Sequence, residues 1–347
     1  MINRRLLNLI PVLLVALLSC DEASNPANSE FMIISNAGNP LNGIVSIYAY
    51  PSQNFEEEAF RFSSTTFPVK VVDADLSDNE LSIIKKDDST EPDKIEVVNI
   101  SDWTDFRSTD LFLVANFSRL ASLNDKIFVA GSAQDGSFHF LVFNKATLAK
   151  EDSIFLGDYA EIRTIITHND KIYISHNNGG GVSFLLILST LNYAPLDEIE
   201  LPNISEDLVV DSEGNILAFH KSGFVKINST TLASTPVTIP QGNVFYGPGG
   251  SSFGFDKQKN IVYYFTYAAQ PAPAPYHLAA FNLTSNEPIE IEREFMNGSS
   301  IDFDNTTGKL IIGTHDTSKG IVNFYKTNGK FIDDFFVPNT PLKIIFK

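Results

Sequence analysis

Short turns followed by apolar, β-type runs recur along the whole chain. Each run begins with a polar residue and continues with mostly branched or aromatic residues, as in Lys126-Ile-Phe-Val-Ala and Lys171-Ile-Tyr-Ile-Ser, and its start returns every 44 to 50 residues. The seven starts are Glu30, Glu80, Lys126, Lys171, Asn215, Asn260 and Lys309. This period, with several strands in each copy, is typical of a β-propeller, so the sequence predicts seven blades.

The segments between these runs also have strand patterns. Residues 137–144 alternate apolar and polar positions, and 153–156 and 162–167 follow before the next run starts. Helical periodicity is nearly absent beyond residue 30. We therefore expect an all-β domain at 30–347 with four-stranded antiparallel blades. If each recurring run is the second strand of its blade, the C-terminal segment 341–347 is a surplus strand that closes the ring by completing the first blade.

The first twenty residues predict export and a lipid anchor. Arg4 and Arg5 precede a low-polarity stretch that ends in Leu17-Leu-Ser-Cys20. That pattern describes a secretory signal over 1–19 that is too short to span a bilayer, and its end looks like a bacterial lipobox, which implies acylation of Cys20. The alternative is an ordinary signal peptide that ends near a cysteine. Residues 20–29 are small and polar, as in a flexible tether.

The composition excludes some classes of partner and of catalytic chemistry. The formal net charge is −17, and loss of the two arginines with the signal lowers it to −19. Such acidity argues against nucleic acid as a partner. Cys20 is the only cysteine, so thiol catalysis and an intramolecular disulfide are excluded. Aspartates precede several runs at Asp211, Asp256 and Asp304, where an Asx side chain fixes a tight hairpin.

Three segments carry a family resemblance: Phe31-Met-Ile-Ile-Ser-Asn-Ala-Gly38, Gly43-Ile-Val-Ser-Ile-Tyr-Ala-Tyr50 and Gly320-Ile-Val-Asn-Phe-Tyr-Lys-Thr-Asn-Gly-Lys330. They look like the YncE-like (YVTN or WD40 repeat-like) propeller lipoproteins of Bacteroidetes. The resemblance implies a cell-surface lipoprotein of the outer membrane, and in some members of that class cobalamin capture for a TonB-dependent transporter. Asp21 and Glu22 resemble the export signal of that phylum, although a periplasm-facing anchor stays open.

The connecting loops supply candidate ligand-binding residues. His176, His220 and His315 lie five or six residues past the start of a run, at equivalent positions in three blades. We expect them on loops at one end of the ring. We expect aromatic and polar groups from a second loop set at the same end, where rings give contact area to a flat ligand. These are Trp103, Asp105, Arg107, Tyr159 and Tyr246, and the loop of blade six adds Tyr267.

Signatures of catalysis and cofactor binding are weak. Gly250-Ser-Ser-Phe-Gly254 fits the nucleophile-elbow pattern formally, but a strand follows where a helix is needed. No known metal-ligand spacing or cofactor motif occurs, so we expect no catalytic residue, metal or cofactor. The leading interpretation is a non-enzymatic, lipid-anchored propeller that captures a cobalamin-like or glycan nutrient at its loop face. The alternatives are an interaction scaffold of the cell envelope, and a lactonase-like hydrolase using His176, Arg107 and Glu161.

Overall fold

The structure is a computed structural model. It describes residues 29–37, 42–50, 54–62, 69–87, 93–101, 103, 105–110, 116–132, 137–157, 159–178, 181–203, 205–239, 243–245, 253–267, 276–291, 293–295, 298–315, 319–337 and 341–346. The predicted signal peptide, Cys20 and most of the tether lie outside these ranges. Within them there is no helix long and apolar enough to cross a membrane.

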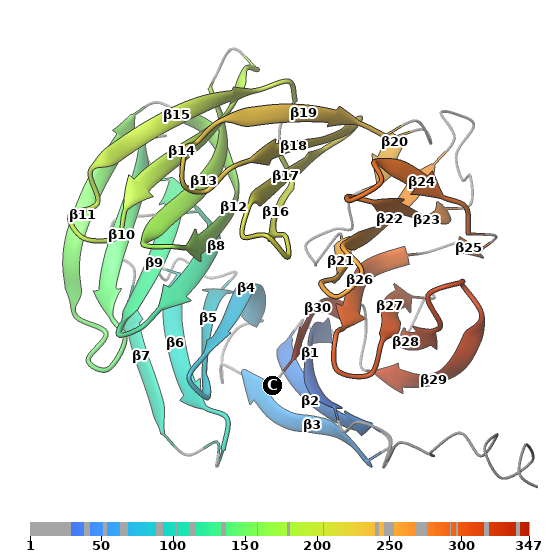
Figure 1. Cartoon of the computed structure of the whole chain (residues 1–347). Coiled ribbons are helices and arrows are strands. Elements are labelled where there is room, and N and C mark those ends of the chain that lie inside the picture. The colour runs from blue at the N-terminus through green and yellow to red at the C-terminus, as the bar shows by residue number, and fades with distance from the viewer. Residues whose placement is uncertain are drawn as a thin grey trace, which may run out of the picture.

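Seven antiparallel blades stand around a common axis, as predicted (Figure 1), and a single parallel bridge between Asn42 and Val69 joins blades one and two. From the axis outward, blade one is β30 (Pro341–Phe346), β1 (Ser29–Ala37), β2 (Asn42–Tyr50) and β3 (Asn54–Phe62); blade two is β4 (Val69–Ser77), β5 (Glu80–Asp87), β6 (Lys94–Asn99) and β7 (Phe106–Asp110). In the same direction, blade three is β8 (Asn116–Leu123), β9 (Lys126–Ser132), β10 (Phe138–Asn144) and β11 (Lys150–Gly157); blade four is β12 (Tyr159–His168), β13 (Lys171–Asn178), β14 (Ser183–Ser189) and β15 (Pro195–Leu201).

The remaining blades follow the same order. Blade five is β16 (Asp207–Val210), β17 (Ile216–His220), β18 (Gly223–Ile227) and β19 (Ser234–Thr238); blade seven is β26 (Gly298–Asp304), β27 (Lys309–His315), β28 (Gly320–Tyr325) and β29 (Phe331–Val337). Blade six has a divided inner strand, β20 (Asn243–Phe245) and β21 (Phe253–Asp256), then β22 (Ile261–Tyr267) and β23 (Tyr276–Asn282), and a divided outer strand, β24 (Glu287–Ile289) and β25 (Glu294–Phe295). The recurring runs are thus the second strands.

The C-terminal strand closes the ring, which confirms the prediction from the surplus segment. β30 pairs antiparallel with β1, and Ile33 lies opposite Ile344. In this position β30 is the innermost strand of blade one, so the first and last segments of the chain share a sheet. Closure of this kind leaves no blade without neighbours and no open edge at the junction.

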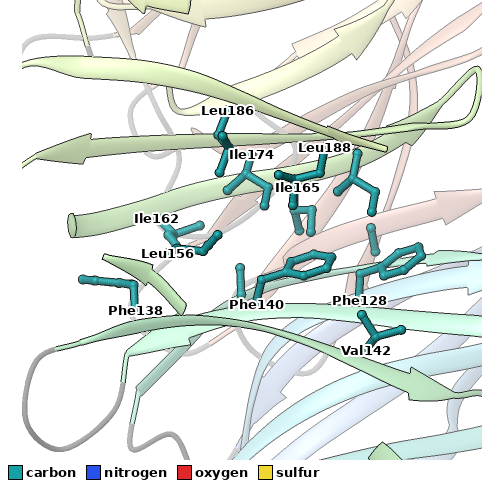
Figure 2. Packing of buried hydrophobic residues seen from close by; sticks show 13 residues of the cluster. Phe128, Phe138, Phe140, Val142, Leu156, Ile162, Ile165, Ile174, Leu186 and Leu188 are labelled. Atoms are coloured by element: carbon teal, nitrogen blue, oxygen red, sulfur yellow. The ribbon is translucent and has the colours of Figure 1, made fainter. Parts of the chain in front are cut away.

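The hydrophobic core lies between adjacent blades. In blade three, alternate residues of β9 face opposite neighbours: Phe128 packs toward blade four, whereas Ile127 packs toward blade two. Figure 2 shows Phe128 and Phe140 of blade three opposite Ile174 and Leu186 of blade four. Truncation of such a buried side chain to alanine costs about 3–5 kcal/mol. Because each layer is shared by two blades, the ring is held by seven interfaces of one kind.

The predicted Asx turns are present. Asp211 Oδ1 accepts the backbone N–H of Asn215 at 2.8 Å, Asp256 Oδ1 that of Gln258 at 3.1 Å, and Asp304 Oδ1 that of Thr306 at 2.8 Å. These carboxylates satisfy backbone donors in the turns before the second strands. Their role is to shape the hairpins.

The inner strands share an irregularity at one level of the ring. In blades one, two, three, four and seven, the pairing between the first and the second strand shifts by one residue. The shift always falls at the fourth and fifth residues after the start of the recurring run, which in blade one are Ile34 and Ser35. In blade six the inner strand is divided at the same level, because Phe245 pairs with Phe265 and Phe253 pairs with Tyr264. A β-bulge turns side chains to a new direction, so this level sets what faces the axis.

Candidate functional site

A cavity of about 440 Å³ lies on the axis of the ring. The innermost strands of blades two to five, β4, β8, β12 and β16, line it together with Lys343 of β30, and Figure 1 shows these strands around the centre. None of the described residues that line it is aromatic. Its polar lining residues are Asp73, Asp75, Ser77, Arg119, Ser122, Thr164, Thr167, Glu206, Asp207 and Lys343.

A belt of polar side chains lies at one end of this cavity, at the level of the bulges. Asp73, Arg119, Thr164, Asp207 and Lys343 each pair with the fifth residue of a recurring run, so they stand at the same level in five successive blades. We call these five residues the axial belt. From the belt the cavity extends along the inner strands toward Ser77 and Thr167, which lie near the turns between first and second strands.

Two aspartates of β4 satisfy the exposed edge of the next inner strand. Asp73 Oδ2 accepts the backbone N–H of Leu120 at 3.0 Å, and Asp75 Oδ2 accepts that of Ser122 at 2.7 Å. An inner strand has no partner on its axial side, so its edge N–H groups need acceptors. Burial raises the pKa of Asp75, although Lys343 and the Ser122 N–H act in the opposite direction.

Lys343 ties the closing strand to blade two. Its ammonium donates to Asp73 Oδ1 at 3.1 Å and to the Ala74 carbonyl oxygen. Burial alone lowers the pKa of Lys343, but the charges of Asp73 and Asp75 outweigh it, so the pKa rises and the group stays cationic. The ring closure therefore depends on an ion pair at the axis as well as on strand pairing.

The opposite wall is richer in carboxylates. Glu206 pairs with Arg163 at 3.3 Å between Oε2 and NH1, and burial raises the pKa of Glu206 despite this cation. Asp207 Oδ1 accepts the N–H of Leu208 at 2.9 Å. Asp302, on the inner strand of blade seven, has a pKa raised to about 8 by burial and further by the charge of Asp207, against the opposing Phe303 N–H and Lys343. These carboxyl groups therefore lie in surroundings that disfavour further negative charge.

The predicted histidines lie toward the expected end of the ring, but on strands. His176 is within β13 and His220 ends β17, and their side chains are 0% and 4% exposed. His176 stacks on Phe184, and its Nε2 lies 3.2 Å from Glu198 Oε1. The expectation of solvent-facing loop histidines is thus wrong for these two, because the second strands run to the end of the ring. His315 ends β27, and its side chain is not described.

The predicted second loop set is divided between the two ends. Trp103 and Asp105 lie in the turn between β6 and β7, and Arg107 is on β7 itself, so this group belongs to the end opposite the histidines. Half-buried Trp103 packs against the core between blades one and two. The Arg107 guanidinium donates to the Lys145 carbonyl oxygen at 2.9 Å and pairs with Glu80. The correction follows from the strand count: the Trp103 turn joins a third and a fourth strand.

The predicted tyrosines are described only in part. Tyr159 begins β12 and pairs with Asn178, and Tyr267 ends β22 and pairs with Asn243. Both residues lie near the end of the ring that carries the histidines. Their side chains are not described, and Tyr246 lies outside the described residues. Their contact with a ligand stays a prediction.

The three residues of the lactonase-like alternative have separate partners. Arg107 pairs with Glu80, Glu161 with Arg163 at 2.7 Å, and His176 with Glu198. The described residues contain no group of three or more His, Cys, Asp or Glu side chains placed to hold a metal ion.

Sequence reasoning did not find the residues that line the axial cavity. A signal was present, because Asp73 and Asp75 interrupt the apolar strand Val71–Leu76 and Lys343 interrupts Leu342–Ile345. In the innermost strand of a blade, a charged residue at a position that the apolar pattern predicts to be buried indicates a side chain that faces the other inner strands.

Similarity to known proteins lies in the fold. No protein-family model matches the sequence, and no curated protein matches it. A Bacteroides fragilis NCTC 9343 protein named "putative 6-phosphogluconolactonase" has a TM-score of 0.64 at 9% identity, with 94% of this chain and 99% of that chain covered. A Lactobacillus plantarum protein has a TM-score of 0.65 at 11% identity, with 92% and 99% covered.

A third structure carries a different name. A quinoprotein alcohol dehydrogenase-like protein of Bacteroides thetaiotaomicron VPI-5482 has a TM-score of 0.59 at 14% identity, with 93% of this chain and 92% of that chain covered. These proteins have different names and are at most 14% identical to this chain, so the similarity shows the propeller fold alone.

Proposed function

We propose that this protein is a non-enzymatic, lipid-anchored binding propeller that holds a small polar nutrient in its axial cavity. The observation that carries the proposal is the cavity itself. Its volume of about 440 Å³ falls within the range of about 300–1,000 Å³ that small-molecule sites occupy. Five blades contribute polar groups at one level, which is how a ring presents several convergent contacts to one ligand.

The lining favours a hydroxyl-rich ligand such as a glycan unit over a cobalamin-like ring. Hydroxyl groups of Ser77, Thr164 and Thr167 and the carboxylates of Asp207 and Glu206 are groups that bind sugars by hydrogen bonds. A large flat ring requires stacking surfaces, and no described lining residue is aromatic. A ligand of the cobalamin class would have to bind at the predicted loop residues outside the cavity.

A binding role accounts for the site better than hydrolysis does. The lactonase-like alternative requires His176, Arg107 and Glu161 to meet, whereas each is held by a different partner. A general base must lie within hydrogen-bonding reach of its substrate together with the other reacting groups.

Capture at the membrane completes the proposal. Acylation of Cys20 would hold the propeller on the outer membrane, with its domain at the cell surface, and stable anchoring requires two or more acyl chains because each buried methylene contributes about 0.8 kcal/mol. The ligand would pass to a TonB-dependent transporter. The interaction scaffold remains the alternative, in which the recovered partner is another envelope protein and the cavity binds nothing.

The cavity is tested by ligand binding to the full-length protein. Calorimetry with a panel of free hexoses, amino sugars, uronic acids, diamines and amino acids is expected to give at least one saturable response. Thr164→Trp places an indole in the cavity and should abolish ligand binding. If Thr164→Trp does not fold, Ser77→Tyr fills the same cavity from its other end. Thr235→Trp, on the exposed outer strand β19, is the matched control. Failure of every panel member, or equal binding by the filled variants, would refute the proposal.

The membrane part is tested by recovery of partners from gently solubilised native membranes. Tagged full-length protein is expected to bring down a TonB-dependent transporter at near-equal stoichiometry, and Cys20→Ser, which cannot be acylated, should lose the membrane fraction. Recovery of a different envelope protein without a transporter would favour the scaffold.

A further inference from the structure

We propose that the axial cavity selects ligands that carry an amine as well as hydroxyl groups, that is, organic ammonium compounds in preference to neutral or anionic molecules of the same shape. The inference rests on the proposed function, because it names the ligand class of the same cavity. Its first support is the excess of carboxylates over cations around the axis. The lining carries four carboxyl groups, Asp73, Asp75, Glu206 and Asp207, against two cations, Arg119 and Lys343.

The charge of the cavity lining also acts on a neighbouring carboxyl group. Burial raises the pKa of Asp302 to about 8, so this group is largely neutral near pH 7. The charge of Asp207 adds to this rise, so the wall beside Asp302 is already negative. An additional anion in this space would be repelled, whereas an ammonium group would be attracted.

Most of the positive charge is already used within the protein. Lys343 binds Asp73 and the Ala74 carbonyl oxygen, and Arg163 pairs with both Glu161 and Glu206. The negative charge of Asp73 is likewise shared among Lys343 and two backbone N–H groups. Blade five contributes Glu206 and Asp207 and no cation to the lining, so a ligand cation would meet the largest local excess of carboxyl groups there.

A buried hydroxyl group points to the second half of the ligand class. Ser122 lines the cavity and is only 8% exposed, yet its Oγ has no hydrogen-bond partner among the described residues. A buried polar group without a partner costs free energy. A ligand hydroxyl or ammonium group near β8 would supply the missing partner after rotation of the Ser122 side chain toward the cavity, because its Oγ is enclosed in the wall.

The cation that fits is organic and not a bare metal ion. A metal ion needs several oxygen or nitrogen ligands at one point, and the described carboxylates form no such group. They are distributed along the walls of an elongated polar cavity. An ammonium ion on a hydroxylated frame presents several donors at separate positions, which matches this distribution.

The test compares ligands of one shape that differ only in charge. Calorimetry on the full-length protein would use D-glucosamine, D-glucose and D-glucuronate, and then the shorter series 2-amino-1,3-propanediol, glycerol and glycerate. In at least one series the amine is expected to bind about tenfold or more tightly than the neutral compound, which corresponds to about 1.4 kcal/mol. The acid should bind least.

The wall residue is tested with a matched control. Asp207→Asn should reduce the advantage of the amine at least about threefold, and raising the salt concentration from about 0.05 to about 0.5 M should reduce it in the parent protein. Asp197→Asn is the control, because Asp197 accepts its neighbour's N–H at 2.9 Å, as Asp207 does, but lies exposed on outer strand β15. The Asp197→Asn variant should bind the amine with the same advantage over the neutral compound as the parent protein does.

The outcomes separate this inference from the proposed function. If a neutral or acidic compound binds best and Thr164→Trp abolishes its binding, the cavity is a ligand site and the amine inference is wrong. If no compound of either series or of the wider panel binds, both are wrong. Retention of the full amine advantage in Asp207→Asn and at high salt would also overturn the inference.

Discussion

Replacement of Asp302 by asparagine should remove a large part of the pH dependence of stability. In the folded protein, burial and the charges of Asp207 and Asp304 raise the pKa of Asp302 to about 8, while the Phe303 N–H and Lys343 oppose the shift. In the unfolded chain the pKa returns to its ordinary value of 3.8. The folded state thus holds a proton that the unfolded state releases throughout the interval between these values.

The sign and size of the effect follow from this difference. Because the folded pKa is the higher one, the contribution of Asp302 to stability is fully present below about pH 4 and is lost progressively as the pH rises to about 8. The loss is at most about 1.4 kcal/mol per pH unit. Between about pH 5 and about pH 7 it reaches at most about 2.7 kcal/mol, and partial screening by water lowers the expected value to about 2 kcal/mol. Asparagine resembles the protonated acid and does not titrate.

The assay is urea unfolding of parent and variant proteins at several pH values in this interval. The variant should equal the parent near pH 5 and exceed it by about 2 kcal/mol near pH 7. Asp197→Asn, at an exposed position of an outer strand, should follow the parent at every pH. Parallel pH profiles for Asp302→Asn and parent would refute the assignment of a raised pKa to this carboxyl group.

Three further perturbations test the closure and packing of the ring. Lys343→Met should lower the free energy of unfolding by about 2 kcal/mol, since it leaves the buried Asp73 without its cation, and a midpoint within error of the parent would count against the ion-pair latch. Deletion of residues 342–347 should remove the inner strand of blade one and cause aggregation or non-cooperative melting; an unchanged melting curve would contradict the closure. Gly254→Ala should cost about 1–3 kcal/mol in thermal unfolding, because a Cβ there would lie 3.0 Å from the Asp302 carbonyl carbon and 3.1 Å from its oxygen, and unchanged stability would mean that blades six and seven can separate slightly.

The sequence predicted the architecture because a propeller repeats its local pattern. Each second strand is buried on both faces, so its apolar run is continuous and its start is easy to recognise, as at Lys126 and Lys171. The role of the C-terminal segment followed from counting: a chain that begins with a second strand must supply the missing first strand elsewhere. Pairing of Ile33 with Ile344 is the structural counterpart of that count.

The axial residues could not be found in this way, because their role depends on neighbours in other blades. Asp73 acts on the backbone of Leu120, which lies 47 residues along the chain, and Lys343 acts on Asp73 across 270 residues. Nothing in the local pattern states which strand edge a carboxylate will meet. The histidines were misplaced for a related reason: a residue five positions past the start of a run belongs either to a loop or to a long strand, and only the strand length decides between them.

The chemistry of the axis follows from the geometry of the ring. Every inner strand leaves one edge without a strand partner, so side chains of the next blade must satisfy it, as Asp75 does for Ser122 and Thr167 for the Ser122 carbonyl oxygen. Polar residues at the axis are therefore first required by folding. The cavity lining nevertheless holds four carboxyl groups against two cations, and two of these carboxyl groups, Glu206 and Asp207, come from one blade. Beside them lies Asp302, whose pKa is raised by burial and further by the charge of Asp207. A bound cation would offset this local excess of carboxyl groups beside a cavity of about 440 Å³.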